Sequence, residues 1–151
     1  MIIREATRDD LPAIIELLHE DVIREVDESA VAATAYGDAF DEITSDAHQQ
    51  LLVGEVDGEV VATAQLTWVR HLTYVGGLMC VVESVRVRSD LRGRGLGREL
   101  MEHVIALGRN RGAARVELTT NAHRLRARQF YADLGFVASH VGMKYYLGGK
   151  S

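Results

Sequence analysis

The feature that most constrains the fold is the stretch 89–100, SDLRGRGLGREL, which has three glycines and three arginines in twelve positions. A valine-rich run over 78–89, LMCVVESVRVRS, precedes it and has the composition of a β-strand. Apolar residues then recur at helical spacing, at Leu96, Leu100, Met101, Val104, Ile105 and Gly108. The sequence therefore predicts a strand, a glycine-rich turn and an amphipathic helix in direct succession.

The other elements follow from periodicity and from turn and cap signals. Before the glycine turn we expect a strand over 1–6, a helix over 8–26 with Thr7 as N-cap, a short helix near 38–47, and a hairpin over 49–69 that turns at Asp57-Gly58. After it we expect a strand over 114–120, a helix over 123–135 ended by Gly135, and two closing strands over 136–139 and 141–148.

This order of elements predicts a single domain over residues 1–151 of the α/β (α+β) class. The hairpins give antiparallel pairs, and the strand–helix–strand passages allow a parallel pair, so the sheet should be mixed. Hydrophobic residues make up 47% of the chain, which is enough to form a buried core.

Charge and cysteine content restrict the partners. The formal net charge is −5, so we expect neither nucleic acid nor a membrane surface as a partner. The single cysteine, Cys80, cannot form an internal disulfide, and nothing in the sequence pairs it with a base, so we expect a small buried hydrophobic residue. No signal-peptide pattern or membrane-spanning apolar run is present, which predicts a cytoplasmic protein.

The glycine turn favours an anion site. The first turn of a helix leaves backbone N–H groups unpaired and carries partial positive charge. Glycines allow a bulky anion to approach, and arginines add charge, so a pyrophosphate is the natural ligand. The alternative is a turn that uses glycine only for its positive φ. A P-loop motif is absent, and Arg98 stands where a dinucleotide fingerprint needs its third glycine, which disfavours a nicotinamide-dependent oxidoreductase.

What remains is R-x-x-G-x-G, formed by Arg92, Gly95 and Gly97. This pattern resembles the [Q/R]-x-x-G-x-[G/A] signature of the GNAT acyltransferase superfamily. A second match is A-x-x-F-Y-x-x-x-G-F, at Ala127, Phe130, Tyr131, Gly135 and Phe136. The resemblance implies a mostly antiparallel sheet of six to seven strands with splayed central strands, flanked by about four helices. It also implies acetyl-CoA as co-substrate. No HxH, HExxH or CxxC spacing in the sequence indicates a metal site.

The resemblance also implies the cofactor contacts. The backbone of Val85, Arg86 and Val87, in the predicted strand, would hold the pantetheine arm. An amide near Val85 would polarise the thioester carbonyl. The pyrophosphate would lie against the amides of Gly93, Arg94, Gly95, Leu96, Gly97 and Arg98, with help from the Arg92 and Arg94 side chains. Asn121 would contact the pantetheine or adenosine part, or serve as the N-cap of the next helix. The 3′-phosphate would lie near one of Arg124, Arg126 and Arg128.

Two residues are implied as catalytic. Tyr131 would protonate the departing thiolate; its alternative role is that of a core aromatic beside Phe130. Glu83 would act as general base for the amine; its alternative is a solvated glutamate at a strand edge. Simple alternation places Glu83 on the same face as Val85 and Val87, and a β-bulge would change that.

The acceptor is expected to be a small-molecule amine or a peptide amine. The acidic residues of the early helix–loop region would attract a cation: Asp27, Glu28, Asp38, Asp41, Glu42 and Asp46. Tyr36, Trp68 and Tyr74 could form an apolar wall. The predicted activity is direct acetyl transfer in a ternary complex by a homodimer. The alternative is a non-catalytic acyl-CoA-binding sensor or interaction module of the same fold.

Overall fold

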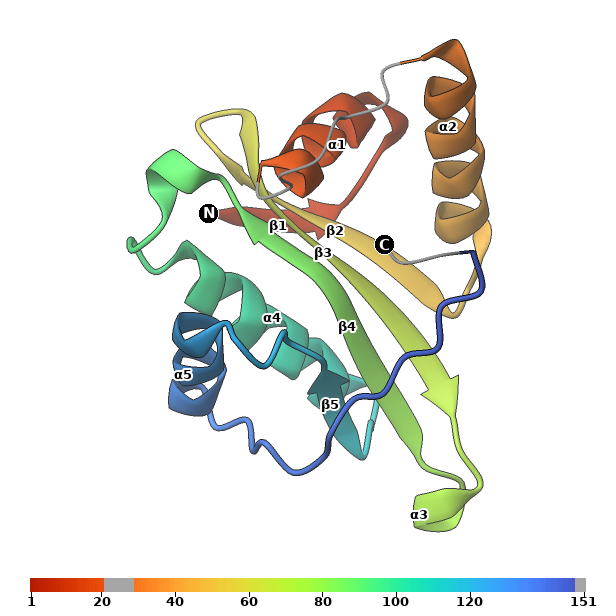
Figure 1. The fold of residues 1–151 in the computed structure, drawn as a ribbon, viewed down its shortest axis with the longest axis vertical. Coiled ribbons are helices and arrows are strands. Elements are labelled where there is room, and N and C mark those ends of the chain that lie inside the picture. The colour runs from red at the N-terminus through yellow and green to blue at the C-terminus, as the bar shows by residue number, and fades with distance from the viewer. Residues whose placement is uncertain (21–28, 149–151) are drawn as a thin grey trace. The chain divides into compact units, whose positions relative to one another are not determined.

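The computed structural model describes residues 1–20 and 29–148 (Figure 1). It divides into two compact units, Met1–Leu118 and Thr119–Ser151, which are described separately below. The predicted helix from Thr7 is confirmed as far as His19, and residues 21–26 of its expected continuation lie outside the described residues.

The first unit is built on a five-stranded sheet, which is mixed as the sequence predicted. Its strands are β1 (Ile2–Glu5), β2 (Gln49–Val56), β3 (Glu59–Arg70), β4 (Leu78–Val87) and β5 (Arg115–Leu118). They lie in the order β1-β2-β3-β4-β5. The first three neighbouring pairs are antiparallel, and β4 and β5 are parallel. The β2–β3 hairpin turns at Asp57 and Gly58, with φ of 51° and 81°, as the Asp-Gly signal predicted.

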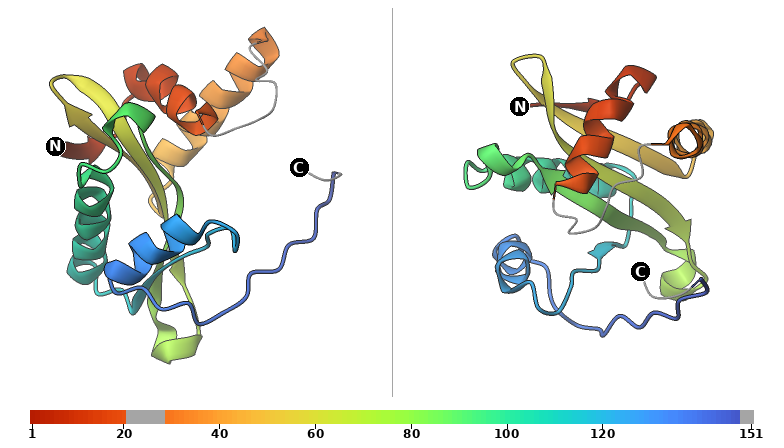
Figure 2. Two further views of the ribbon diagram at one scale, coloured as in Figure 1. Left: turned by 60° about the vertical axis from the view of Figure 1, so that its left-hand side comes forward. Right: turned by 45° about the horizontal axis from the view of Figure 1, so that its top comes forward.

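Helices cover both faces of the sheet (Figure 2). They are η1 (Arg8–Asp10), α1 (Leu11–His19), α2 (Ala30–Ser45), the one-turn α3 (Thr73–Gly76), η2 (Ser89–Leu91) and α4 (Leu96–Asn110). Helices α1 and α2 pack on one face, and α4 packs on the other. The expected short helix near 38–47 is therefore wrong in its start, because Ser29 accepts a hydrogen bond from the Ala32 amide at 3.1 Å and caps α2 earlier.

The core lies between the sheet and these helices. Helix α4 contributes Leu100, Met101 and Val104, which are fully buried, and α1 contributes Ile14 and Leu17. These side chains lie on the helical faces that the apolar spacing predicted. The buried sheet residues include Leu52, Val53, Val61, Ala62, Ala64, Leu66, Met79, Cys80 and Val82. Burial of this apolar surface fixes the sheet between its two helical layers.

A charged network joins β1 to the start of α1. The Asp10 carboxylate accepts hydrogen bonds from Arg4 Nη1 at 2.7 Å and Nη2 at 2.9 Å, and from the Thr7 amide at 2.7 Å. Arg4 also pairs with Glu55 on β2, at 3.0 Å. The Arg4 guanidinium is the main reason why the pKa of Asp10 is lowered to about 2, and the Thr7 amide adds to the effect against the opposing cost of burial.

The second unit contains α5 (Leu125–Asp133). Gly135 follows its end with φ of 97°, as expected for a helix-ending glycine. The Gly135 amide donates to Ala132 O at 2.9 Å and the Phe136 amide to Tyr131 O at 3.0 Å. These are the two hydrogen bonds of a Schellman motif, and the rings of Tyr131 and Phe136, 5.7 Å apart, add its hydrophobic contact.

The two closing strands are wrong: residues 136–148 contain no strand. The sheet therefore has five strands rather than six to seven. Alternation of apolar and polar side chains describes only which face a residue would present. A strand also needs a neighbour to receive its backbone hydrogen bonds, and none of the described strands pairs with this segment.

We predict that Asp10 makes the free energy of unfolding depend on pH at values below the usual pKa of an aspartate. The folded-state pKa is depressed, so the contribution to stability is present above the unfolded pKa near 4 and is lost as the pH falls from about 4 to about 2. Urea unfolding at pH 5, 4, 3 and 2 should show an advantage over Asp10→Asn on the order of 1–2 kcal/mol that shrinks across this window. The exposed Asp9→Asn is the matched control; an equal profile for both variants would contradict the assignment.

Candidate functional site

The loop between β4 and α4 has a backbone that glycine makes possible. Gly93 has φ of 77°, and Gly95, the N-cap of α4, has φ of 83°. A Cβ at either position would meet no heavy atom within 4 Å. Glycine is therefore required here by conformation and not by crowding, and the surroundings of both residues are open.

The N-terminus of α4 is prepared for an anion. No side chain caps it, and the Glu99 amide, which donates to Gly95 O at 3.0 Å, makes an early hydrogen bond of the helix. Helix geometry directs the N–H groups of the first turn, including those of Leu96 and Gly97, along the axis towards the loop. The partial positive charge of the helix end adds to this, so a phosphate group is well matched to the position.

The arginines of the loop are held by specific partners. Arg92 Nε donates to Val87 O at 3.1 Å, and its Nη2 lies 3.7 Å from the Glu20 carboxylate. Arg98 pairs with Glu102 at 3.0 Å, one helical turn further on. These contacts orient the cationic side chains near the glycines without removing their charge from the loop.

The charge of Arg94 affects the nearby Asp90 carboxyl. The pKa of Asp90 is lowered, mainly by its hydrogen bonds with Arg88, and the charge of Arg94 adds a small part. Arg88 Nε lies 2.7 Å from the Asp90 carboxylate, and Arg88 Nη1 lies 2.9 Å from Glu59. This cluster ties the loop to the β2–β3 hairpin.

Glu20 fixes the start of the loop, a role that the sequence analysis did not predict. Its carboxylate accepts hydrogen bonds from the Ser89 amide at 3.0 Å and from Ser89 Oγ at 3.2 Å. The contact joins residues 69 positions apart, at the end of α1 and the start of η2. No local pattern in the sequence signals such a pair, because it depends on the tertiary packing of α1 beside β4.

Strand β4 carries a β-bulge beside the loop. Gln65 on β3 pairs with Glu83 on β4, and Thr63 pairs with Arg86. Between these two pairs β3 advances by two residues and β4 by three. The extra residue is accommodated at Ser84, which has φ of 54°. The pairing of β4 with β5 ends just before this point, at Val82 and Leu118. The central strands therefore part at the bulge, as the resemblance implied.

The bulge corrects one expectation. By register, Glu83 shares a face with Gln65, Thr63 and Arg86, whereas Val87 pairs with Ala62 on the opposite face. The prediction that Glu83 and Val87 face the same side is therefore wrong, because the inserted residue reverses the alternation. Glu83 is exposed and faces away from the α4 side of the sheet.

Arg86 lies on this same face in an unusual state. Its Nη1 donates to the carbonyl of Val85 at 2.9 Å. Its Nε is buried, and within residues 1–20 and 29–148 it has no hydrogen-bond partner. Buried polar groups in folded proteins are normally hydrogen-bonded, and an acceptor on a bound ligand would satisfy this N–H.

The two predicted site residues of the second unit have defined local roles. Asn121 Oδ1 accepts a hydrogen bond from the His123 amide at 2.9 Å, and its backbone carbonyl accepts one from the Arg124 amide. The N-cap of α5 is Arg124, so the alternative of Asn121 as that N-cap is wrong. Tyr131 is held edge-on between Phe130, at 5.0 Å between ring centroids, and Phe136.

Trp68 and Cys80 belong to the core. They are opposite each other on β3 and β4, and Trp68 lies under the Arg111 guanidinium, 4.3 Å from the ring centroid. The Trp68 indole N–H donates to Gln50 at 2.9 Å. Burial raises the pKa of the Cys80 thiol to about 11, although nearby Arg111 opposes this, and the predicted buried cysteine is confirmed.

The remaining candidates for the acceptor region are dispersed. Tyr36 Oη lies 3.1 Å from His19 Nε2 between α2 and α1. Tyr74 accepts a hydrogen bond from Arg115 at 2.9 Å near the β3–β4 turn. Asp41 pairs with Arg8 at 2.6 Å. Of the acidic residues named above, Asp27 and Glu28 lie outside the described residues.

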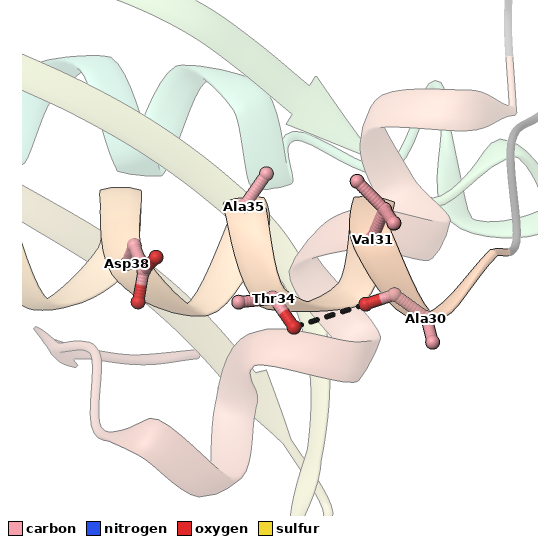
Figure 3. A pocket seen from close by; sticks show the side chains of 5 residues that line it. All are labelled: Ala30, Val31, Thr34, Ala35 and Asp38. Atoms are coloured by element: carbon pink, nitrogen blue, oxygen red, sulfur yellow. Dashed lines mark hydrogen bonds between the residues drawn. The ribbon is translucent and has the colours of Figure 1, made fainter.

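A hollow of about 480 Å³ lies along the first half of α2 (Figure 3). Its lining comes from one helix: Ala30, Val31, Thr34, Ala35 and Asp38. The Thr34 hydroxyl donates to the Ala30 carbonyl at 3.0 Å and is thereby satisfied within the helix. Among the described residues, this lining consists of small side chains and the single carboxylate of Asp38.

Comparison with known proteins agrees with this geometry. A sequence model of the Acetyltransferase (GNAT) family matches residues 11–136. The aminoalkylphosphonate N-acetyltransferase of Salmonella typhimurium is 29% identical over 138 residues, which cover 91% of this chain and 86% of that protein.

Two solved structures have a similar fold. A transcriptional regulator from Bacillus halodurans C-125 has a TM-score of 0.88 at 36% identity, covering 97% of this chain and 99% of that one. Glucosamine-6-phosphate N-acetyltransferase from Arabidopsis thaliana has a TM-score of 0.82 at 25% identity, covering 97% of both chains. The chain belongs to the GNAT acetyltransferase family and is an acetyltransferase; family members generally use acetyl-CoA. Among the described residues, no helix has the length and apolar content needed to cross a membrane.

We predict that Gly95 is required for its left-handed conformation. Gly95→Val should lower the free energy of unfolding by about 1–2 kcal/mol, because a β-branched residue is strained at this φ. Gly95→Asn should lower it less, since asparagine tolerates the left-handed region. Urea unfolding measures both; Gly148→Val, at an open position with an ordinary φ, is the control. Equal losses at Gly95 and Gly148 would contradict the prediction.

Proposed function

We propose that this chain transfers an acetyl group from acetyl-CoA to the primary amine of a small molecule or a peptide, by direct attack in a ternary complex. The observation that carries the proposal is the uncapped, glycine-opened N-terminus of α4, which follows β4 in the chain, together with the end of the β4–β5 pairing at Val82. Family membership supports acetyl-CoA as the ligand whose pyrophosphate this helix end would bind.

The cofactor contacts follow from this placement. In the proposal the pyrophosphate lies against the amides of residues 93–98, with Arg92 and Arg94 supplying charge. The backbone of residues 85–87 holds the pantetheine arm, where β4 has left β5. Support comes from the end of the β4–β5 pairing at Val82, because a strand edge without a neighbour has backbone groups available to a ligand. Asn121 is assigned to the pantetheine or adenosine part.

The chemistry is acyl transfer between sulfur and nitrogen. Glu83 takes a proton from the ammonium form of the acceptor, directly or through a water. The amine lone pair then attacks the thioester carbonyl carbon, and an amide near Val85 stabilises the developing oxyanion by about 3 kcal/mol. Collapse of the tetrahedral intermediate breaks the carbon–sulfur bond. Tyr131 gives its proton to the thiolate, and the product nitrogen releases its second proton to solvent.

Direct transfer is supported by the state of the cysteine. An acetyl-enzyme route needs an accessible thiolate. Cys80 is fully buried and its pKa is raised to about 11, so it is a poor nucleophile.

The acceptor class is taken from charge and from the relatives. The acidic side chains around α2 favour a cationic amine. The relatives named above are, by name, N-acetyltransferases of aminoalkylphosphonate and of glucosamine 6-phosphate. A test panel should therefore contain 2-aminoethylphosphonate, glucosamine 6-phosphate and a short peptide with a free N-terminus. We further propose that both units form one catalytic domain of a cytoplasmic homodimer; light scattering tests the oligomeric state.

Binding of acetyl-CoA tests the anion site. Calorimetry should show acetyl-CoA binding, with NAD and ATP binding much more weakly. Gly97→Glu should reduce acetyl-CoA affinity by at least tenfold, because a carboxylate would face the pyrophosphate at the helix N-terminus. Glu102→Asp, one turn further along α4, is the charge-preserving control. Unchanged affinity in Gly97→Glu would remove the anion site from the proposal.

Tyr131→Phe tests the acid. The variant should lower kcat about 100-fold while the affinity for acetyl-CoA changes less than threefold, because only the proton donor is lost. Phe130→Tyr, a substitution of similar size beside it, controls for packing. Free-thiol release measures turnover. Unchanged kcat would exclude the acid role, and acetyl-CoA binding with no turnover on any amine would favour a binding module.

A further inference from the structure

A row of polar side chains crosses the face of the sheet that carries Glu83. The row consists of Asp46, which follows α2, Gln49 on β2, Gln65 on β3 and Glu83 on β4. Gln65 and Glu83 are register partners on adjacent strands. Register partners on one face have Cβ atoms about 5 Å apart. The first three members are joined by hydrogen bonds: Gln49 Nε2 lies 3.0 Å from Asp46 Oδ2, and Gln65 Nε2 lies 3.2 Å from Gln49 Oε1.

Asp46 fixes the direction of every amide in this row. A carboxylate only accepts hydrogen bonds, so Gln49 must turn its NH₂ group to Asp46. The Gln49 carbonyl oxygen then faces β3, and Gln65 must turn its own NH₂ group to it. The Gln65 carbonyl oxygen Oε1 is left directed away from β2, towards the side of the sheet where Glu83 lies.

The charge on Asp46 is maintained by the same contacts. The pKa of Asp46 is lowered by the hydrogen bond from Gln49 and by one from the His48 amide, at 2.8 Å. The direction of the row is therefore set at neutral pH, with a charged acceptor at its far end.

We infer that Gln65 Oε1 and the Glu83 carboxylate together bind the ammonium group of the acceptor, with Asp46 and Gln49 as positioning residues. This inference rests on the proposed function and names the groups that would recognise its primary amine. Both groups are acceptors only, and a primary ammonium carries three donors. An alcohol has one donor, and a trimethylammonium group has none, so the pair selects primary amines.

The placement also serves the reaction. When Glu83 has taken one proton, the neutral amine keeps two N–H bonds. Donation of one of them to Gln65 Oε1 directs the lone pair away from the sheet and towards an acyl group. Arg86 lies on the same face beyond the bulge, and its Nη1 donates to the Val85 carbonyl at 2.9 Å.

Gln65→Met tests the contact at nearly constant side-chain volume. With the primary amine of the panel that shows the highest kcat/KM, its KM for the amine should rise at least tenfold. Its KM for acetyl-CoA should stay within twofold, because the acetyl-donor site is not changed. Gln129→Met, on the exposed face of α5, makes the same chemical change elsewhere and should leave both constants unaltered. A Gln65→Met enzyme with an unchanged KM for the amine overturns the inference.

A polarity reversal at Gln49 tests the positioning role. Gln49→Glu keeps an acceptor beside Gln65 and should retain the KM for the amine within threefold. Gln49→Lys offers only donors, so Gln65 should turn its carbonyl oxygen to the lysine and present NH₂ to the acceptor; the KM for the amine should rise about tenfold. A purely structural role predicts similar effects for both variants, and similar KM values would overturn the inference. Thermal unfolding identifies a variant that has lost its fold.

The unmodified protein provides a test that does not depend on variants. The alcohol and trimethylammonium analogues of the best amine should inhibit at least tenfold more weakly than the amine binds. Equal inhibition overturns the inference. If the enzyme acetylates the amine and the KM for the amine is unchanged in Gln65→Met, only this inference is overturned. If the protein binds acetyl-CoA but acetylates no amine, the proposed function is overturned and this inference with it.

Discussion

The extra residue in β4, accommodated at Ser84, is the constraint on which the site depends. A bulge adds one residue to one strand only, so it locally bends and twists that strand. In this chain the bend coincides with the end of the β4–β5 pairing at Val82. It also reverses the alternation of side chains, which brings Glu83 and Arg86 to one face. Without the bulge, simple alternation would place Glu83 on the same face as Val87.

The loop that follows is held in place from several directions. Glu20 binds the backbone and hydroxyl of Ser89, and Arg88 joins Asp90 to Glu59. These contacts are exposed ion pairs and hydrogen bonds, which individually stabilise little. Their joint effect is positional: they fix both the hairpin and the end of α1 relative to the glycines. The N-terminus of α4 can then present its amides in one arrangement, which is what binding a pyrophosphate requires.

Much of the fold could be predicted from local signals. The hairpin turn at Asp57-Gly58, the ten-residue β4, the amphipathic α4 and the glycine-ended α5 all appear where the sequence placed them. The failures have different causes. A strand needs a neighbour for its backbone hydrogen bonds, which side-chain patterns do not encode, so the closing strands were wrong. The start of α2 was missed although Ser29 is a local N-cap signal. The prediction that Glu83 and Val87 share a face was wrong because a bulge has no signature in a single sequence. The residue type of Ser84 does not indicate its positive φ.

The sequence by itself determined the chemistry that is local. The glycine spacing defines the uncapped start of α4, where we propose that an anion binds, and the Ala127–Phe136 pattern defines a Schellman motif that orients Tyr131. Both work within one turn of backbone, where neighbours along the chain are also neighbours in space. Tertiary structure alone decided which distant residues meet: Glu20 with Ser89, and the row from Asp46 to Glu83. Strand register and helix packing bring these residues together, and register is fixed by burial of the whole sheet and not by any of the residues it aligns.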